Sequence, residues 1–369
     1  MKRILWMIAL LSLAVLLFAC GDAAHTSQEY TTAAPATATP TESDTTASKG
    51  GETPLSSTAP AAKETTAEVT FADVLYDTTP LTGEDGTPYL INWNPYLLSP
   101  VAEDAYEDAF HAAIKAILNH RKTVIFSTLD ELKAVRDNLF YEFPPSALCT
   151  WTADEKSLSL RFTYTYERSE HLEKLASFGD TVEDIIQKSL LFGDGEAEKA
   201  ILLYHEIAYT VDYFQVDYTK AETNAYTALT EKKAICYSFS DAYNYLLRQV
   251  GVRAYLVKGY RSGDRAAHGW SLVEIDGRYY HCDATWEYSM LDGIGLYYFA
   301  MSDSRRQKNV VLAEATVGEG ILKNKLTLKA DSDRFTGING DKFREKTWTL
   351  DREKEAIVYR GREYSYQAQ

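Results

Sequence analysis

The sequence predicts an α+β fold in which a helix that begins with a cysteine packs on an antiparallel sheet. Apolar residues from Cys236 to Val250 recur at helical spacing, which predicts a helix with one buried face. The stretch from His268 to Tyr288 holds two alternating runs around Asp276-Gly277, a pair typical of two-residue hairpin turns. A third alternating run, from Leu158 to Tyr166, predicts a half-buried strand earlier in the chain.

The first residues of the chain resemble a bacterial export signal. Lys2-Arg3 precedes an apolar run over residues 4–18, which is short for a membrane span. Leu17-Phe18-Ala19-Cys20 resembles the lipobox, in which the leader is cut before a cysteine that then carries the lipid. Met1–Ala19 is therefore predicted to be a signal peptide, and Cys20 the lipidation site of an extracytoplasmic, membrane-anchored lipoprotein on a bacterial surface. An uncleaved anchor and simple secretion remain alternatives.

A disordered stalk is predicted to follow, over residues 20–71. From Ala23 to Thr70 the chain consists mostly of Ala, Thr, Ser and Pro, and Tyr30 is its only aromatic residue. Such a segment cannot bury enough apolar surface to offset the conformational entropy that folding would cost. We expect a flexible linker that holds a folded domain away from a membrane.

An α/β accessory region is predicted over residues 72–194. Apolar residues at helical spacing between Ala102 and His120 predict one helix. Thr128 and Glu131 have the spacing of a capping box, which predicts the start of a second helix. The other elements predicted between here and the central helix are the strand at 158–166 and helices at 181–191 and 196–213.

Short elements are predicted after the cysteine-bearing helix. Gly251 can end that helix in the left-handed C-cap conformation, and residues 253–260 then predict a strand. The end of the chain is polar and contains only brief strand-like runs, at 321–328 and 356–359. Residues 304–369 are therefore predicted to be a β-rich extension.

The turn at Asp276-Gly277 sets the register of the predicted hairpin. Counting back from a two-residue turn places His268 opposite Thr285, and side chains alternate between the two faces. One face should then carry His268, Trp270, Leu272, Glu274, Tyr279, His281, Asp283 and Thr285. His268 and Asp283 become diagonal neighbours on that face, although such a pair is also common as an ordinary hydrogen bond at a protein surface.

Cys236 supplies this pair with a chemical partner. It lies at the predicted N-terminus of a helix, where unpaired backbone N–H groups and the helix dipole stabilise a thiolate. Cys236 would attack a carbonyl, His268 would carry the proton, and Asp283 would orient the ring. The backbone N–H of Cys236 is one candidate oxyanion donor. The alternative for a lone cysteine is a small buried apolar residue.

Other residues near these three have two interpretations each. Trp270, Trp286 and Tyr279 are candidates for a substrate-binding wall, with core packing as the alternative. His281 shares the face of the candidate pair and could reach the site. Cys282 should point to the opposite face, into the core.

Composition and motifs argue against several classes of protein. The formal net charge of −15 argues against a nucleic-acid partner, because phosphate binding needs a basic surface. We find no calcium-loop, dinucleotide or Walker motif, and Tyr209 stands where a zinc motif opened by His205-Glu206 needs its second histidine. We therefore expect neither a metal nor a cofactor. With Cys20 acylated, an odd number of cysteines remains, so at least one thiol should be free.

Three stretches resemble the core of the transglutaminase-like superfamily: KKAICYSFSDAYNYLLRQVGVRAYLVKGY, HGWSLVEIDGRYYHCDATWEY and YYFAMSD. Domains of that superfamily are papain-like. In them a cysteine heads a helix, a histidine begins a strand in a His-Ala-Trp-Asn type motif, and an aspartate opens an Asp-Pro-Thr-Trp type motif. The matching residues are Cys236, His268 with Trp270, and Asp283 with Thr285 and Trp286. Ser238-Phe239, Ser271 and Ala284 depart from the usual residues, which leaves substrate preference open.

The resemblance implies a catalytic core over residues 195–303. It further implies thiol-dependent acyl transfer or hydrolysis at an amide or peptide bond through a Cys236-His268-Asp283 triad. Because the superfamily includes both cross-linking enzymes and peptidases, the direction of the reaction is open. For a stalked surface domain we favour hydrolysis of a peptide or protein substrate, such as one associated with the cell wall. The alternative is an inactive module of the same fold that binds a peptide or a cell-wall polymer.

Overall fold

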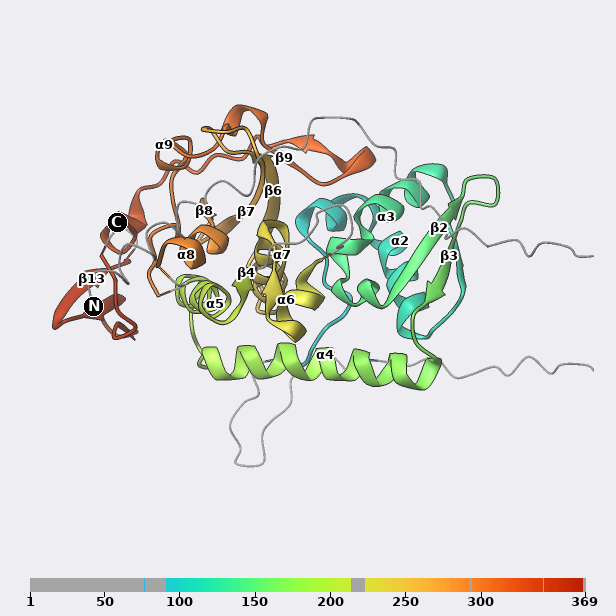
Figure 1. Ribbon diagram of the computed structural model, residues 1–369, viewed down its shortest axis with the longest axis horizontal. Helices are drawn as coiled ribbons and strands as arrows, with labels where there is room; N and C mark the ends of the chain where they lie inside the picture. Colours follow the sequence, from blue (N-terminus) through green and yellow to red (C-terminus); the bar gives the residue numbers. More distant parts are fainter. Residues whose placement is uncertain (1–75, 77–90, 214–222, 292–293, 341, 368–369) are drawn as a thin grey trace, which may run out of the picture. The chain divides into compact units, whose positions relative to one another are not determined.

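The computed structural model describes residue 76 and residues 91–213, 223–291, 294–340 and 342–367 (Figure 1). The predicted signal peptide, the candidate lipidation site at Cys20 and the predicted stalk lie outside these residues. Within the described part, no helix is both long enough and apolar enough to span a bilayer.

Helices and mostly antiparallel strands follow one another along the chain, as an α+β fold requires. The helices are α2 (Pro100–Leu118), α3 (Leu129–Glu142), α4 (Arg168–Ser189), α5 (Glu196–Thr210), α6 (Ala225–Glu231), α7 (Cys236–Gln249), α8 (Ala284–Leu291) and α9 (Asp303–Arg306). The first strands are β1 (Thr123–Ile125), β2 (Cys149–Asp154), β3 (Ser159–Tyr164), β4 (Asp212–Tyr213), β5 (Lys233–Ala234), β6 (Ala254–Tyr260), β7 (Ala267–Ile275) and β8 (Arg278–Cys282). The last are β9 (Thr316–Val317), β10 (Asn324–Lys325), β11 (Thr349–Asp351), β12 (Ala356–Tyr359) and β13 (Arg362–Ser365).

The region before the core is built on a small antiparallel sheet in the order β1-β3-β2, with α2 and α3 beside it (Figure 1). The predicted capping box is present at the start of α3. The Thr128 side chain accepts the N–H of Glu131, and the Glu131 carboxylate accepts the N–H of Thr128. Strand β3 is the predicted alternating strand, with Leu160 and Phe162 buried.

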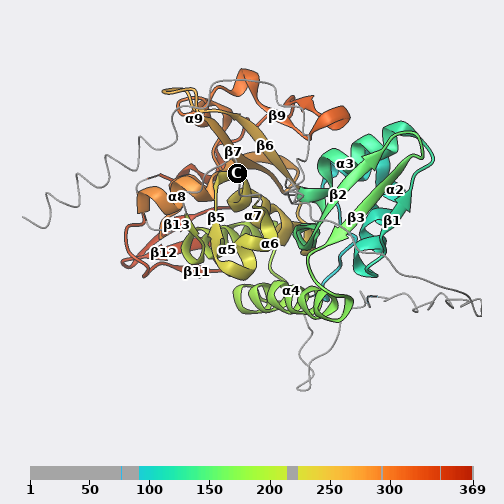
Figure 2. The same cartoon turned by 45° about the vertical axis from the view of Figure 1, so that its right-hand side comes forward.

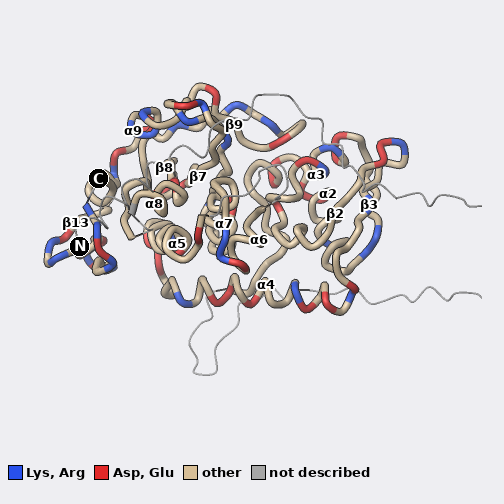
Figure 3. Tube along the Cα trace, viewed as in Figure 1, with Lys and Arg blue, Asp and Glu red and all other residues tan. Residues whose placement is uncertain are grey.

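Helix α4 begins at Arg168, well before the predicted start at Thr181. The sequence does not predict one continuous helix here, because Gly179 lies inside it. A glycine inside a helix lowers the stability of that helix and usually marks its end. The glycine is needed here for close packing: a Cβ at this position would lie 2.6 Å from the Trp93 ring. The helix lies along α5 and α6 (Figure 2), and it carries both acidic and basic residues (Figure 3).

The central sheet has the strand order β10-β9-β6-β7-β8, and α7 packs against β6 and β7. The predicted helix is confirmed, with its C-cap at Val250 and with Gly251 in the left-handed region at φ 79°. The expectation of a single buried face was wrong, because nearly every residue of α7 is buried. The sheet covers one side of this helix and α5, α6 and α8 cover others, so α7 is a central element of the core.

Strands β7 and β8 form the predicted hairpin. Both turn residues have positive φ, 51° at Asp276 and 74° at Gly277, as a type I′ turn requires. Ile275 consequently pairs with Arg278. The register that the turn length predicts is therefore confirmed.

The second strand of the hairpin is shorter than predicted, because β8 ends at Cys282 and helix α8 follows. His268 therefore has no partner on β8 and pairs with Gly259 on β6, so its predicted pairing with Thr285 was wrong. Asp283 lies between the strand and the helix. Its side chain accepts the N–H of Trp286 at 3.1 Å, the local bond by which an aspartate favours a helix start.

The end of the chain forms a third antiparallel sheet, β11-β12-β13, in which β12 is the strand predicted at 356–359. The predicted run at 321–328 is instead a short 3-10 turn followed by the two-residue strand β10. One hydrophobic core extends from α2 through α7 to Tyr359 and Tyr366. The accessory region and the C-terminal extension thus share that core with the central helix and sheet.

Candidate active site

Cys236 is the first residue of α7. Ile235 before it is extended, at φ −101° and ψ 177°, and its apolar side chain offers no acceptor to the N–H groups of the first helical turn. The positive end of the helix dipole is therefore directed at the region of the thiol. The side chain of Cys236 is largely buried.

His268 and Asp283, which the sequence places on one face, form a direct hydrogen bond. His268 Nε2 lies 2.7 Å from Asp283 Oδ2, and both side chains are buried. Because a carboxylate only accepts, Nε2 carries the proton of the neutral ring, and Nδ1 is the nitrogen available to the thiol. Cys236 lies close enough to this ring to raise its pKa. The structure thus brings all three predicted residues together.

The thiol and the imidazole approach each other from different faces of β7. Helix α7 packs on the face that carries Gly269 and Ser271, since a Cβ at Gly269 would lie 2.4 Å from the Tyr237 ring. His268 belongs to the alternate face, beside Trp270. The two groups meet because His268 lies at the start of β7, next to the N-terminus of the helix.

The charges of His268 and Asp283 depend on each other. Burial alone would lower the pKa of His268, but Asp283 and Cys236 outweigh it and raise that pKa to about 9. Burial would likewise raise the pKa of Asp283, yet His268 and Arg306 hold it below its usual value. The arrangement therefore favours an ionised carboxylate beside an imidazole that readily takes up a proton.

Arg306 is a residue of this site that sequence reasoning missed. Its Nη2 donates to Asp283 Oδ2 at 2.8 Å, and neither side chain has exposed surface. The arginine comes from α9, beyond the predicted core boundary at residue 303. A signal was present in the double arginine that follows YYFAMSD, but spacing alone does not say which arginine points inward.

The three predicted substrate-contact residues lie in different environments. Trp270 is completely buried, so it supports the site from within and is not placed to contact a substrate. Trp286 is half-buried and stacks on His268, with 4.6 Å between ring centroids. Tyr279 is half-buried and lies edge-on to Tyr255. Trp286 is therefore the one of the three that borders both the candidate pair and the surface.

His281 lies behind the site rather than in it. Its Nδ1 accepts the indole N–H of Trp270 at 3.0 Å, and its Nε2 bonds Asp303 at 2.9 Å. Burial lowers the pKa of this fully buried histidine, and Arg306 acts in the same direction. The ring is therefore neutral and holds the indole of Trp270 in one orientation.

The backbone at Asp283 is held by a second polar group. The Tyr204 hydroxyl lies 3.1 Å from the Asp283 carbonyl and 2.9 Å from Glu287 Oε2. Glu287 also accepts the N–H of Tyr298 at 2.8 Å, and burial raises its pKa to about 7. The start of α8 is thus anchored to α5 and to the segment that leads to α9.

The other two cysteines that the structure describes, and the excluded zinc motif, have no part in the site. Cys149 and Cys282 are buried free thiols, and burial raises the pKa of each to about 12. Cys282 points into the core as predicted. His205 lies against Trp348, and the described residues contain no group of three acidic, histidine or cysteine side chains suited to a metal ion.

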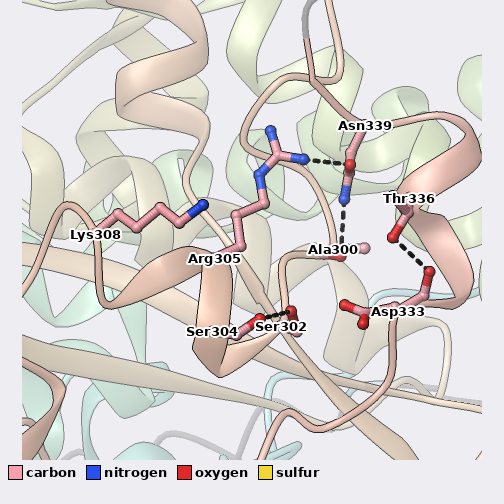
Figure 4. A pocket seen from close by; sticks show the side chains of 8 residues that line it. All are labelled: Ala300, Ser302, Ser304, Arg305, Lys308, Asp333, Thr336 and Asn339. Atoms are coloured by element: carbon pink, nitrogen blue, oxygen red, sulfur yellow. Dashed lines mark hydrogen bonds between the residues drawn. The ribbon is translucent and has the colours of Figure 1, made fainter.

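A cavity of about 420 Å³ lies beside α9, away from the thiol. Its lining residues are Ala300, Ser302, Ser304, Arg305, Lys308, Asp333, Thr336 and Asn339 (Figure 4). Arg305 reaches toward Asn339 there, whereas the next residue, Arg306, reaches Asp283. None of the three candidate catalytic residues lines this cavity. The candidate active site is therefore identified from Cys236, His268 and Asp283, and not from the position of the cavity.

Residues 186–284 match the sequence profile of the transglutaminase-like superfamily. The chain contains a transglutaminase-like domain. The match includes all three candidate catalytic residues, begins near the end of α4 and stops at the start of α8. The transglutaminase-like domain thus overlaps the predicted core of 195–303, while Arg306 lies outside the matched residues.

Solved structures similar to this chain are more distant. A protein from Cytophaga hutchinsonii provisionally described as a cysteine protease shares 21% identity over 32% of this chain and 38% of its own, with a TM-score of 0.24. A TGase shares 16% identity over 37% of this chain and 43% of its own, with a TM-score of 0.28. Calcium-bound LapG from Legionella pneumophila shares 10% identity over 46% of this chain and 86% of its own, with a TM-score of 0.30.

The chain spans less than half the length of the first two of these proteins. No curated protein matches it. The match to the transglutaminase-like superfamily is confined to residues 186–284 of the chain. Its α+β core, with a helix bearing a cysteine on an antiparallel sheet, is the papain-like arrangement predicted from the sequence.

Proposed function

We propose that the transglutaminase-like domain hydrolyses an amide bond of a peptide or protein through a thioester on Cys236. The observation that carries this proposal is the 2.7 Å bond between His268 and Asp283 together with the place of Cys236 at the start of α7, close enough to the ring to raise its pKa. Thiol, imidazole and carboxylate in that order form the nucleophile, the proton carrier and the orienting group of a catalytic triad.

The proposed steps follow from these three roles. His268 takes the thiol proton, the sulfur of Cys236 bonds to the carbonyl carbon, and the C–N bond breaks as the amine leaves with the proton from His268. Water then attacks the thioester and gives a proton to His268, the C–S bond breaks, and the sulfur regains that proton as the acid departs. Backbone N–H groups at the start of α7 support the negative oxygen of each tetrahedral intermediate.

Water is the acceptor we favour, and an amine is the alternative within the same mechanism. An amine in place of water would leave an isopeptide or amide cross-link, since it attacks the same thioester. A stalked domain on a cell surface meets water at far higher concentration than any amine. Peptides of the cell wall or surface proteins are the substrates within reach of such a domain.

The location on the membrane is part of the proposal and depends on Cys20. Lipid on this residue would tether the domain outside the cytoplasm, with residues 20–71 as a spacer. Cys20→Ala should move the protein from the membrane fraction of a bacterial host into the soluble fraction. Immunoblotting of both fractions checks this. Retention of the alanine variant in the membrane would contradict lipid anchoring at Cys20.

Alkylation of Cys236 tests the triad without knowledge of the substrate. Iodoacetamide should label Cys236 readily near pH 6, where an ordinary thiol reacts slowly, because the imidazolium stabilises the thiolate. His268→Ala should remove this reactivity and slow labelling near pH 6 by about 10- to 100-fold. Mass spectrometry of the Cys236 peptide across pH measures both, with the buried Cys149 as an internal reference.

Two outcomes would overturn the enzyme assignment. One is a labelling rate for Cys236 that follows an ordinary thiol in the native protein. The other is the same pH profile with and without His268, which would mean that the ring does not act on the sulfur. Either result would favour the alternative, a module of this fold that binds a peptide or polymer without cleaving it.

A further inference from the structure

Arg306 is a completely buried cation in the short helix α9. Its Nη2 donates to Asp283 Oδ2 at 2.8 Å, while its Nε and Nη1 have no hydrogen-bond partner among the residues that the structure describes. Burying a charge is costly unless the charge is paired. One hydrogen bond to a carboxylate, with the other guanidinium groups unpaired, does not offset the cost of burying this charge. A contribution to stability alone therefore does not explain Arg306.

Two tryptophan rings hold the guanidinium in place. Its carbon lies 4.6 Å from the Trp270 ring centroid and 4.5 Å from that of Trp286, within the range of cation–π attraction. Trp270 is itself fixed, because its N–H bonds His281, which bonds Asp303 at the head of the same helix α9. A continuous set of contacts therefore begins at Asp303 in α9, passes through His281 and Trp270, and ends at Arg306 in the same helix.

Arg306 and His268 donate to the same oxygen of Asp283, which is Oδ2. The other oxygen accepts the N–H of Trp286 at 3.1 Å. Arginine keeps its charge at every relevant pH, so Asp283 has a cationic partner whether or not His268 is protonated. A nearby positive charge also disfavours a second one, so Arg306 weakens the affinity of the His268 ring for a proton.

We propose that Arg306 is a positioning residue for the Cys236-His268-Asp283 triad, an inference that rests on the proposed function. It keeps Asp283 ionised and oriented throughout the reaction. It also prevents His268 and Asp283 from forming an isolated ion pair that would retain the proton. The imidazole can then both accept a proton from the thiol and return it to the leaving amine.

The surroundings of the pair contain one permanent charge. The titratable and charged groups that face His268 and Asp283 are Cys236 from α7, Tyr204 from α5, Cys282 from β8, Glu287 from α8, Tyr298 from the segment before α9, and Arg306. Burial raises the pKa values of Tyr204, Cys282 and Tyr298, which keeps these groups neutral, and it raises the pKa of Glu287 to about 7. Removal of Arg306 is therefore the change that tests the proposal.

An NMR titration of His268 measures the effect directly. The full chain, labelled with ¹³C in its histidine rings, carries Cys236→Ala, so that the result does not depend on a reactive thiol. Loss of one signal in His268→Ala assigns the ring. Arg306→Gln should raise the pKa of His268 by about 1 or more, because one positive charge next to the pair is gone.

Two further variants distinguish the effect of the Arg306 charge on the pKa of His268 from the effect of its packing. Arg306→Lys keeps the charge and should leave the pKa of His268 near its starting value, even if the protein is less stable. Arg305→Gln is the matched control: it removes the same charge from the adjacent residue, whose guanidinium bonds Asn339 and the Tyr297 carbonyl instead. It should leave the titration unchanged.

An unchanged pKa of His268 in folded Arg306→Gln would overturn the proposal. If that variant does not fold, Arg306→Lys decides, since a large rise in the pKa of His268 with the charge retained would also overturn it. These outcomes are distinct from a failure of the proposed function. That failure would appear as an ordinary thiol profile for Cys236 and would leave the titration of His268 readable.

Discussion

Cys236→Ala should abolish cleavage of labelled casein, and His268→Ala should lower its rate by about 10²- to 10⁴-fold. The first change removes the atom that forms the thioester, and the second removes the group that carries its proton. Release of soluble label measures hydrolysis. Incorporation of a fluorescent primary amine into intact casein measures transfer in the same samples, so the assay also decides which acceptor the thioester prefers.

Two control variants distinguish the loss of a catalytic group from a loss of activity through unfolding. Cys149→Ala removes another buried free thiol, and His111→Ala removes a histidine that bonds Tyr96 in the accessory region. Both should cleave casein at nearly the native rate. Cleavage that persists in a folded Cys236→Ala protein would assign the nucleophile to another residue.

Glu142→Ala should lower the free energy of unfolding by about 3–5 kcal/mol, because it leaves Arg248 as a buried charge without its carboxylate. Glu142 at the end of α3 accepts from Arg248 of α7 at 2.9 Å, and the two side chains are only 7% and 6% exposed. It also accepts the N–H and the hydroxyl of Ser99, before α2. One carboxylate therefore joins two helices of the accessory region to the helix that bears Cys236.

Urea unfolding followed by tryptophan fluorescence measures this effect. Glu155→Ala is the control, since its carboxylate is 54% exposed and lies 3.6 Å from Arg136. An exposed pair of this kind contributes about 0–1 kcal/mol. A loss below about 1 kcal/mol for Glu142→Ala would mean that the accessory region and the core are not coupled through this ion pair.

The parts of the fold that could be predicted are those governed by nearby residues. The capping box at Thr128, the left-handed Gly251 and the two-residue turn at Asp276-Gly277 each depend on a few adjacent positions. Helix α4 was predicted too short because Gly179 accommodates Trp93, a residue distant in the sequence. The strand at His281 was predicted too long, because the bond from Asp283 to the following helix was not recognised.

The residues of the candidate site likewise fall into those that local sequence patterns predict and one that they do not. Alternation and turn length placed His268 and Asp283 on one face, and the helix pattern placed Cys236 at an N-terminus. Arg306 could not be found by these means. Its role depends on two tryptophans and a carboxylate from separate elements, and no local pattern distinguishes it from Arg305.

The sequence by itself determined the hairpin register, the start of the cysteine-bearing helix and the three residue types of the candidate triad, because periodicity and turn geometry are local properties. Only the tertiary structure decided that α7 lies on the opposite face of β7 from His268, that the thiol reaches the ring at the start of that strand, and that Arg306 shares Asp283 with it. Such contacts depend on how distant segments pack, and packing is set by the shapes of side chains that the chain brings together only when it folds.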